Sequence, residues 1–162
     1  MARPDQKPEG RSNAPARRRT RAREVAVQFL YQLDLRGDEV LADLKQFLDD
    51  SQESGALRDE DARSFCERLI LGVHEHRTAI DESLQKVAKN WVLDRMATVD
   101  RNVLRMAAFE LLYCHDVPPK VSINEAIEIG KSYSTANTGS FVNGILDRIR
   151  IDYAKRDPDS VS

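Results

Sequence analysis

The sequence predicts an all-α fold, a compact bundle of about seven helices. Charged residues make up 32% of the 162 residues, aromatic residues only 6%, and glycine occurs seven times, a balance typical of solvent-exposed helices. Apolar residues recur at the helical spacing i, i+3, i+4 along most of the chain. No stretch of useful length alternates apolar with polar residues as a strand does, so we expect helices alone.

Charge divides the chain into a basic arm and an acidic body. Residues 1–23 carry eight Lys and Arg side chains but only two carboxylates, although the whole chain has a net charge of −2. Residues 1–16 are rich in proline and polar residues, so we expect a disordered tail there, an ordered helical domain over 17–152 and a flexible tail over 153–162. A basic arm of this kind indicates a polyanionic or acidic partner.

The first three helices follow from apolar stripes separated by polar residues. A helix from Ala22 ends at Gly37, a second covers 40–48, the polar run DDSQESG at 49–55 predicts a loop, and a third helix covers 65–73. The stripe of the first helix consists of Val25, Ala26, Phe29, Leu30 and Leu33. Such stripes are typical of helices that face a core.

A segment that is apolar almost all the way round predicts the central helix of the bundle. This segment covers residues 103–113. Before this segment, apolar spacing predicts a fourth helix over 80–91, and the stretch from Trp91 to Thr98 interrupts the helical pattern. After it, Pro118 and Pro119 break the helical pattern.

The last part of the domain contains competing signals. Ser122 and Glu125 are spaced as a capping box for a sixth helix, and SYSTANTGS at 132–140 predicts a loop. In SFVNGILDRI, Asn143-Gly144 indicates a hairpin, but no strand flanks it and the apolar spacing is helical, so we expect a helix. Glycine inside a helix costs about 1 kcal/mol relative to alanine, so we expect another helix or, if the basic arm marks a nucleic-acid-binding protein, an RNA backbone to approach Gly144 closely.

The clearest candidate for binding is the run ARRRTRAR directly before the first predicted helix. It holds Arg17, Arg18, Arg19, Arg21 and Arg23. Positive charge is unfavourable beside a helix N-terminus, so a binding role explains these residues better than a solvated tail. Guanidinium groups bind phosphate in a bidentate manner, but charge alone leaves DNA, RNA and acidic protein surfaces open.

A second candidate is the loop at 134–140 together with Phe141. Backbone amides at a helix start can receive a phosphate, and an aromatic ring beside them can stack on an unpaired base. The alternative is an ordinary capped loop with Phe141 in the core.

Nothing in the sequence indicates an enzyme, a cofactor or a metal site. No P-loop, dinucleotide-binding, serine-hydrolase or zinc-protease motif is present. His74 and His76 lack partners at metal-ligand spacing, and Cys66 and Cys114 fall in apolar patterns typical of buried thiols. Neither a signal peptide nor a membrane-spanning stretch is evident, which predicts a cytoplasmic protein.

Two charged residues lie inside the apolar segment at 103–113. They are Arg105 and Glu110. Because a buried ion needs a partner, we expect Arg105 to pair with Glu125 or Glu110. The alternative is that both side chains reach solvent.

Three stretches taken together resemble the NusB transcription antitermination family. They are RRRTRAREVAVQFLYQ at 17–32, VDRNVLRMAAFELLY at 99–113, and PPKVSINEAIEIGKSY through FVNGILDRI at 118–149. The resemblance implies two packed helical sub-bundles and a non-catalytic RNA-binding domain over 17–152. It implies single-stranded boxA RNA and NusE, a small-subunit ribosomal protein, as direct partners. NusA, NusG and RNA polymerase are implied as further partners in reading through terminators, notably in ribosomal RNA operons, and a homodimer is left open.

The resemblance also implies roles for individual residues. The positions that match the RNA-contacting regions of the family are Arg18, Arg19, Arg21, Arg23, Lys120, Asn137, Thr138, Ser140 and Phe141. Tyr31 and Asp100 match positions that face NusE. Thr20 falls where relatives often have another basic residue.

Two other interpretations compete with this one. The same fold serves as the N-terminal RNA-binding domain of an rRNA cytosine methyltransferase, although this chain has no methyltransferase domain and the tail after Arg150 argues against a truncated enzyme. A helical scaffold that binds only proteins is the other alternative. Salt-sensitive affinity for single-stranded RNA distinguishes the adaptor from the scaffold.

Overall fold

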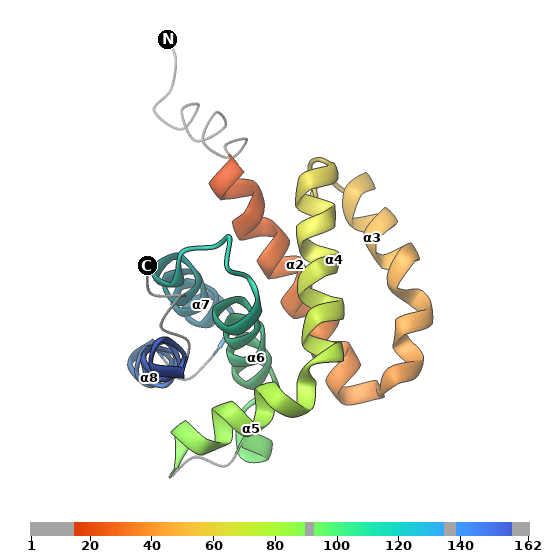
Figure 1. Ribbon diagram of the computed structural model, residues 1–162. Coiled ribbons are helices and arrows are strands. Elements are labelled where there is room, and N and C mark those ends of the chain that lie inside the picture. The colour runs from red at the N-terminus through yellow and green to blue at the C-terminus, as the bar shows by residue number, and fades with distance from the viewer. Residues whose placement is uncertain (1–14, 90–92, 135–138, 157–162) are drawn as a thin grey trace. The chain divides into compact units, whose positions relative to one another are not determined.

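The regular structure of the chain is helical, as the sequence predicts. The structure, a computed structural model, describes residues 15–89, 93–134 and 139–156 (Figure 1). Across these ranges it contains seven α-helices, α2 to α8, and two short 3-10 helices, η2 and η3. The chain divides into two compact units, one that ends at Ile70 and one that starts at Leu71.

The first unit is built on α2, whose apolar stripe is buried as predicted. Its elements are α2 (Pro15–Arg36), η2 (Asp38–Asp43), α3 (Leu44–Glu53) and most of α4 (Glu60–Glu75). Phe29 of α2 packs against Phe47 of α3 with ring centroids 5.0 Å apart. The apolar residues at the centre of this unit include Val25, Ala26, Phe29, Leu30, Leu33, Leu44, Leu48, Leu57, Phe65 and Leu69.

Two helix boundaries in this unit correct the sequence prediction. α2 begins at Pro15 rather than near Ala22, so the arginine run lies within its first turns and not before it. α3 continues to Glu53, so most of the loop predicted at 49–55 is helical. Two polar residues of this run, Asp49 and Gln52, contact α4.

Arg63 of α4 makes those contacts. Its Nη1 donates to Asp49 Oδ1 and to Gln52 Oε1, each at 2.6 Å. The hydrogen bonds from Arg63 and Lys45 hold the pKa of the Asp49 carboxyl below its usual range. The run predicted as a loop therefore ties α3 to the start of α4.

The second unit is arranged around α6. Its elements are α5 (Arg77–Ala88), η3 (Leu93–Arg95), α6 (Thr98–Tyr113), α7 (Pro119–Tyr133) and α8 (Gly139–Arg156). α6 contacts α5, α7 and α8. Every residue from 102 to 111 of α6 is buried. This confirms the prediction that the segment apolar on all sides is central.

The buried charge on α6 has a partner that the sequence prediction did not name. Arg105 is 2% exposed, and its Nε and Nη2 donate to the two carboxylate oxygens of Asp81 on α5, at 2.8 and 3.1 Å. Its Nη1 donates to Asn102 Oδ1 at 3.3 Å. Asp81 is thus a partner of Arg105 that the sequence did not predict, and its two oxygens suit the fork of a guanidinium. The expected pairing with Glu125 or Glu110 stays a prediction.

The predicted capping box is also wrong. α7 begins at Pro119 with Pro118 as its N-cap, so Ser122 lies inside the helix and not at its cap. The Ser122 hydroxyl instead donates to Glu110 Oε1 at 2.9 Å, and both residues are buried. This bond gives Glu110, another of the buried charged residues of α6, a polar partner.

Both cysteines are buried, as expected. Burial raises the pKa of the Cys66 thiol to about 12, which keeps it protonated and unreactive. Within the described ranges, no three His, Cys, Asp or Glu side chains are grouped so as to hold a metal ion. The described helices include none that is long and apolar enough to cross a membrane.

We expect Asp81→Ala to lower the free energy of unfolding by about 3 kcal/mol, the low end for breaking a buried ion pair. The low end applies because the Asp81 side chain is 28% exposed and Asn102 still contacts Arg105. Urea denaturation measures the loss. Glu128→Ala, which removes an exposed ion pair with Lys131, is the control and should change stability by less than about 0.5 kcal/mol. Equal losses in the two variants would contradict the structural role of Asp81.

Candidate nucleic-acid interface

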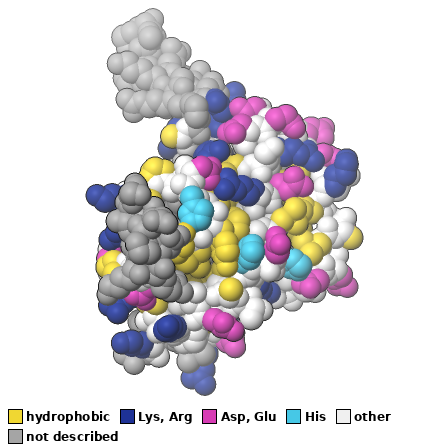
Figure 2. Space-filling view, viewed as in Figure 1, with side chains coloured by type: hydrophobic (Ala, Val, Ile, Leu, Met, Phe, Trp, Pro, Cys, Tyr) yellow, Lys and Arg dark blue, Asp and Glu magenta, His cyan; other side chains and the backbone are white. Residues whose placement is uncertain are grey.

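The first turns of α2 present a dense cluster of arginine side chains. The N-terminus of a helix is the positive end of the helix dipole, and α2 has no acidic residue in its first turn to offset this charge. The carboxylates that pair with these arginines stand at the start of α4 and directly before it. Arg18 Nε lies 2.8 Å from Asp59 Oδ2, and Arg19 Nε lies 3.7 Å from Asp61 Oδ2. Figure 2 shows dark blue basic side chains interspersed with magenta acidic ones around this end of α2.

Phe65 of α4 receives two of the arginines on its ring. The guanidinium carbons of Arg19 and Arg23 lie 4.2 and 5.0 Å from the ring centroid, within the range of cation–π contacts. Arg23 is only 2% exposed. The structure therefore does not support Arg23 as a direct RNA contact, because its side chain is packed inside the unit.

The other three arginines of the run, Arg17, Arg18 and Arg21, line a small pocket. It has a volume of about 260 Å³ and is formed by the first turns of α2 and the segment between α3 and α4. Its lining residues are Arg17, Arg18, Thr20, Arg21, Glu24, Gly55 and Arg58. Arg58 was not identified from the sequence, because it stands apart from the arginine run and matches no motif.

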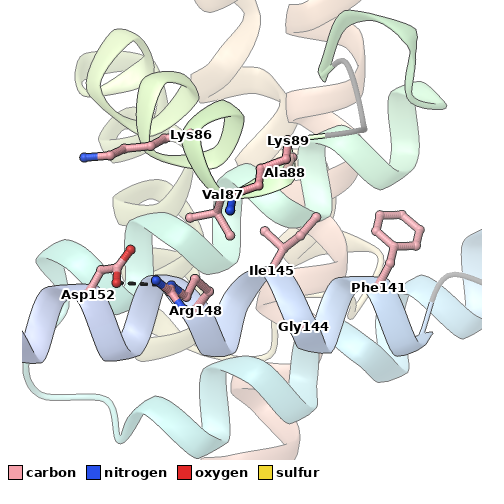
Figure 3. A pocket seen from close by; sticks show the side chains of 9 residues that line it. All are labelled: Lys86, Val87, Ala88, Lys89, Phe141, Gly144, Ile145, Arg148 and Asp152. Atoms are coloured by element: carbon pink, nitrogen blue, oxygen red, sulfur yellow. Dashed lines mark ion pairs between the residues drawn. The ribbon is translucent and has the colours of Figure 1, made fainter.

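Phe141 lines a second and larger pocket, on the face that α8 presents to the end of α5 (Figure 3). The pocket has a volume of about 620 Å³. Its lining residues are Lys86, Val87, Ala88, Lys89, Phe141, Gly144, Ile145, Arg148 and Asp152. Phe141 is half-buried, so it is neither a full core residue nor a free surface ring. An aromatic ring, basic side chains and apolar walls together suit a nucleotide.

The helix through Asn143-Gly144 is confirmed, but one expected reason for the glycine is wrong. A Cβ built at Gly144 would meet no atom within 4 Å. No other helix of the described structure therefore approaches it. Gly144 instead forms an open part of the pocket wall between Phe141 and Arg148 (Figure 3). Close approach of an RNA backbone stays a prediction.

Two of the remaining predicted RNA contacts lie at the starts of α7 and α8. Lys120 is the second residue of α7 and Ser140 the second of α8, and both are exposed. Asn137 and Thr138 lie outside the described residues. Helix starts are suited to phosphate, so Lys120 and Ser140 stay candidates.

The two residues predicted to face a protein partner differ in exposure. Tyr31 on α2 is 38% exposed. Asp100, in the first turn of α6, is 5% exposed, and its Oδ1 has no hydrogen-bond partner among the described residues. The dipole of α6 favours a carboxylate at this position. Because its side chain offers almost no surface, the structure does not support Asp100 as a direct contact.

Comparison with known proteins assigns the chain to a family. The family model described as the NusB family matches residues 20–150. The chain belongs to the NusB family. The transcription antitermination protein NusB of Anaeromyxobacter dehalogenans (strain 2CP-1 / ATCC BAA-258) is 50% identical over 132 residues, which cover 82% of this chain and 89% of that protein. NusB of Myxococcus xanthus (strain DK1622) is 46% identical over 134 residues, 83% of this chain and 94% of that protein.

Solved NusB structures share the fold. T. maritima NusB is 40% identical and aligns over 86% of this chain and 94% of its own, with a TM-score of 0.71. A crystal structure of the antitermination factors NusB and NusE in complex with dsRNA is 28% identical, over 85% of this chain and 98% of that chain, with a TM-score of 0.72. The resemblance drawn from the three sequence stretches is thereby confirmed at the level of the family and the fold.

We expect Gly144→Ala to raise the free energy of unfolding by about 1 kcal/mol, because alanine favours a helix interior and its methyl group has free space. Gly72→Ala is the matched control with the opposite sign, since a Cβ there would collide with the ring of Phe109. Thermal and urea denaturation measure both changes. A Gly144→Ala variant that is less stable than the wild type would contradict the open wall described above.

Proposed function

We propose that this chain is a non-catalytic adaptor that binds single-stranded boxA-type RNA together with NusE and acts in transcription antitermination. The observation that carries the proposal is the arginine cluster on α2, which α4 holds in place while much of it faces a pocket. The curated NusB relatives are transcription antitermination proteins, and one solved NusB structure contains NusE and dsRNA. NusA, NusG and RNA polymerase, in the cytoplasm, belong to the same proposal as members of the larger complex.

Two kinds of contact would act on the RNA. The arginines of α2 would bind phosphates, which gives affinity without sequence preference. The pocket at Phe141 would take a base, and stacking on an aromatic ring is worth about 1–3 kcal/mol per base. Unpaired bases are required for stacking, which favours a single strand over a duplex at this pocket.

A protein partner has a separate surface available on α2. Tyr31 and Leu35 are 38% and 58% exposed and lie four residues apart, so they share one face of the helix. Tyrosine is one of the side chains that are enriched among the residues that dominate binding at protein interfaces. The acidic charge of the chain after residue 23 complements a basic ribosomal protein.

The function is tested by measuring RNA affinity by fluorescence anisotropy. The wild-type chain is titrated onto a boxA RNA, a scrambled RNA of equal length and a duplex of the boxA sequence, each with and without NusE. The proposal expects the tightest binding to single-stranded boxA with NusE present. No preference for boxA in the presence of NusE would contradict it, and no RNA binding at all would favour the protein-binding scaffold.

Replacing both Arg18 and Arg19 by alanine should make the salt dependence of RNA binding shallower. The slope of log K against log salt should lose about 0.7 for each phosphate contact removed from a single strand. Arg36→Ala is the control, because Arg36 is exposed at the other end of α2 and contacts Gln32. An unchanged slope in the double variant would rule out these residues as phosphate contacts.

Phe141→Ala should weaken binding of single-stranded RNA by about 1–3 kcal/mol while helix content stays intact, because the ring is lost from a half-buried position at a pocket. Anisotropy measures the affinity and circular dichroism the helix content. Tyr133→Ala removes an exposed aromatic ring from α7 and serves as the control. Wild-type affinity, or a large loss of helix, would place Phe141 in the core instead.

A further inference from the structure

Four arginines from two distant segments line one small pocket in the first unit. Arg17, Arg18 and Arg21 come from α2, and Arg58 comes from the segment between α3 and α4. Among the described residues that line the pocket, Glu24 is the only carboxylate, and it pairs with Arg21 at 3.0 Å. Asp59 pairs with Arg18, so the described residues at the pocket carry an excess of positive charge that comes from two of the four arginines. Like charges gathered in this way repel, and a bound anion relieves the repulsion.

Asp59 holds one of these arginines beside the segment that carries Arg58. Its Oδ1 accepts a hydrogen bond from the backbone N–H of Ala62 at 2.9 Å, which caps the start of α4. Its Oδ2 lies 2.8 Å from Arg18 Nε. Asp59, which follows Arg58 in the chain, thus caps α4 and forms an ion pair with Arg18. The buried Arg18 Nε has no hydrogen-bond partner among the described residues, so this contact is electrostatic.

The segment before α4 is anchored, so the position of Arg58 is defined. The side chain of Leu57 is 1% exposed, and its backbone N–H donates to the carbonyl of Ser51 at 2.9 Å. Arg58 itself is exposed. Gly55 has a φ of +88°, which favours glycine, and a Cβ there would meet nothing within 4 Å, so this side of the pocket is bare backbone.

We propose that Arg58 completes a phosphate-binding pocket with Arg17, Arg18 and Arg21, and that this pocket holds a backbone phosphate of the bound RNA. This inference rests on the proposed RNA-binding function and adds a contact outside the N-terminal arginine run. Guanidinium groups bind phosphate oxygens in a bidentate manner, and the volume of about 260 Å³ suits a compact anion. The contact fixes the path of the strand and does not read its sequence.

The test compares Arg58→Ala and Arg58→Lys with the wild-type chain on boxA and scrambled single-stranded RNA over a range of salt concentrations. Arg58→Ala should bind both RNAs roughly tenfold more weakly at low salt, and its salt slope should be shallower by about 0.7. Arg58→Lys keeps the charge and should retain most of the slope. Arg36→Ala is again the control, as an exposed arginine of the same unit outside the pocket. Unchanged thermal melting of Arg58→Ala excludes an effect of folding.

The outcomes separate this inference from the proposed function. If Arg58→Ala binds RNA as the wild type does while the Arg18 and Arg19 double variant binds weakly, the role of Arg58 is overturned and the function stands. If Arg58→Ala keeps its RNA affinity but loses affinity for polyglutamate, the pocket takes carboxylates and the RNA assignment is overturned. If the wild-type chain binds no RNA, both proposals fail.

Discussion

The contacts between α2 and the start of α4 are the constraint on which the candidate interface depends. Arg18, Arg19 and Arg23 meet Asp59, Asp61 and Phe65 in the same order along both helices, so the two helices run in parallel here. Exposed ion pairs of this kind contribute up to about 1 kcal/mol each, which is small beside the burial of the apolar stripe of α2. Their main effect is to fix the direction of the guanidinium groups. The apolar core supplies the stability, and the charged contacts decide what the helix presents to a ligand.

In the second unit, too, apolar burial supplies stability while polar contacts fix geometry, because two buried charged residues of α6 bond to neighbouring helices. Arg105 spans from α6 to Asp81 of α5, and Glu110 receives a bond from Ser122 of α7. Neither charge could stay buried without its partner, so each bond specifies which neighbouring helix lies against that side of α6. The apolar residues around them are tolerant of rearrangement by comparison, since dispersion and apolar burial have no direction.

The two candidate regions for RNA use different chemistry. The region on α2 carries guanidinium groups, for which we propose phosphates as ligands, whereas the pocket on α8 combines a half-buried ring, an open glycine and flanking basic residues, for which we propose a base. Single-strand binding commonly needs both, because phosphate contacts give salt-dependent affinity and stacking holds the bases. The chain belongs to the NusB family and is similar to a structure of NusB and NusE in complex with dsRNA.

The sequence alone determined the helical fold, the apolar stripe of α2, the central position of α6 and the continuation of α8 through Asn143-Gly144, because each depends on local periodicity. Tertiary structure decided which partners the polar groups found. Asp81 lies far from Arg105 in the sequence, and Ser122 had a local capping pattern that its bond to Glu110 overrides. Likewise, the arginine run was evident from composition. Only the tertiary structure showed that Arg23 is buried and that Arg58 lies at the same pocket as Arg17, Arg18 and Arg21. Periodicity records which face of a helix is apolar, whereas the choice of a polar partner depends on distances between elements that periodicity does not contain.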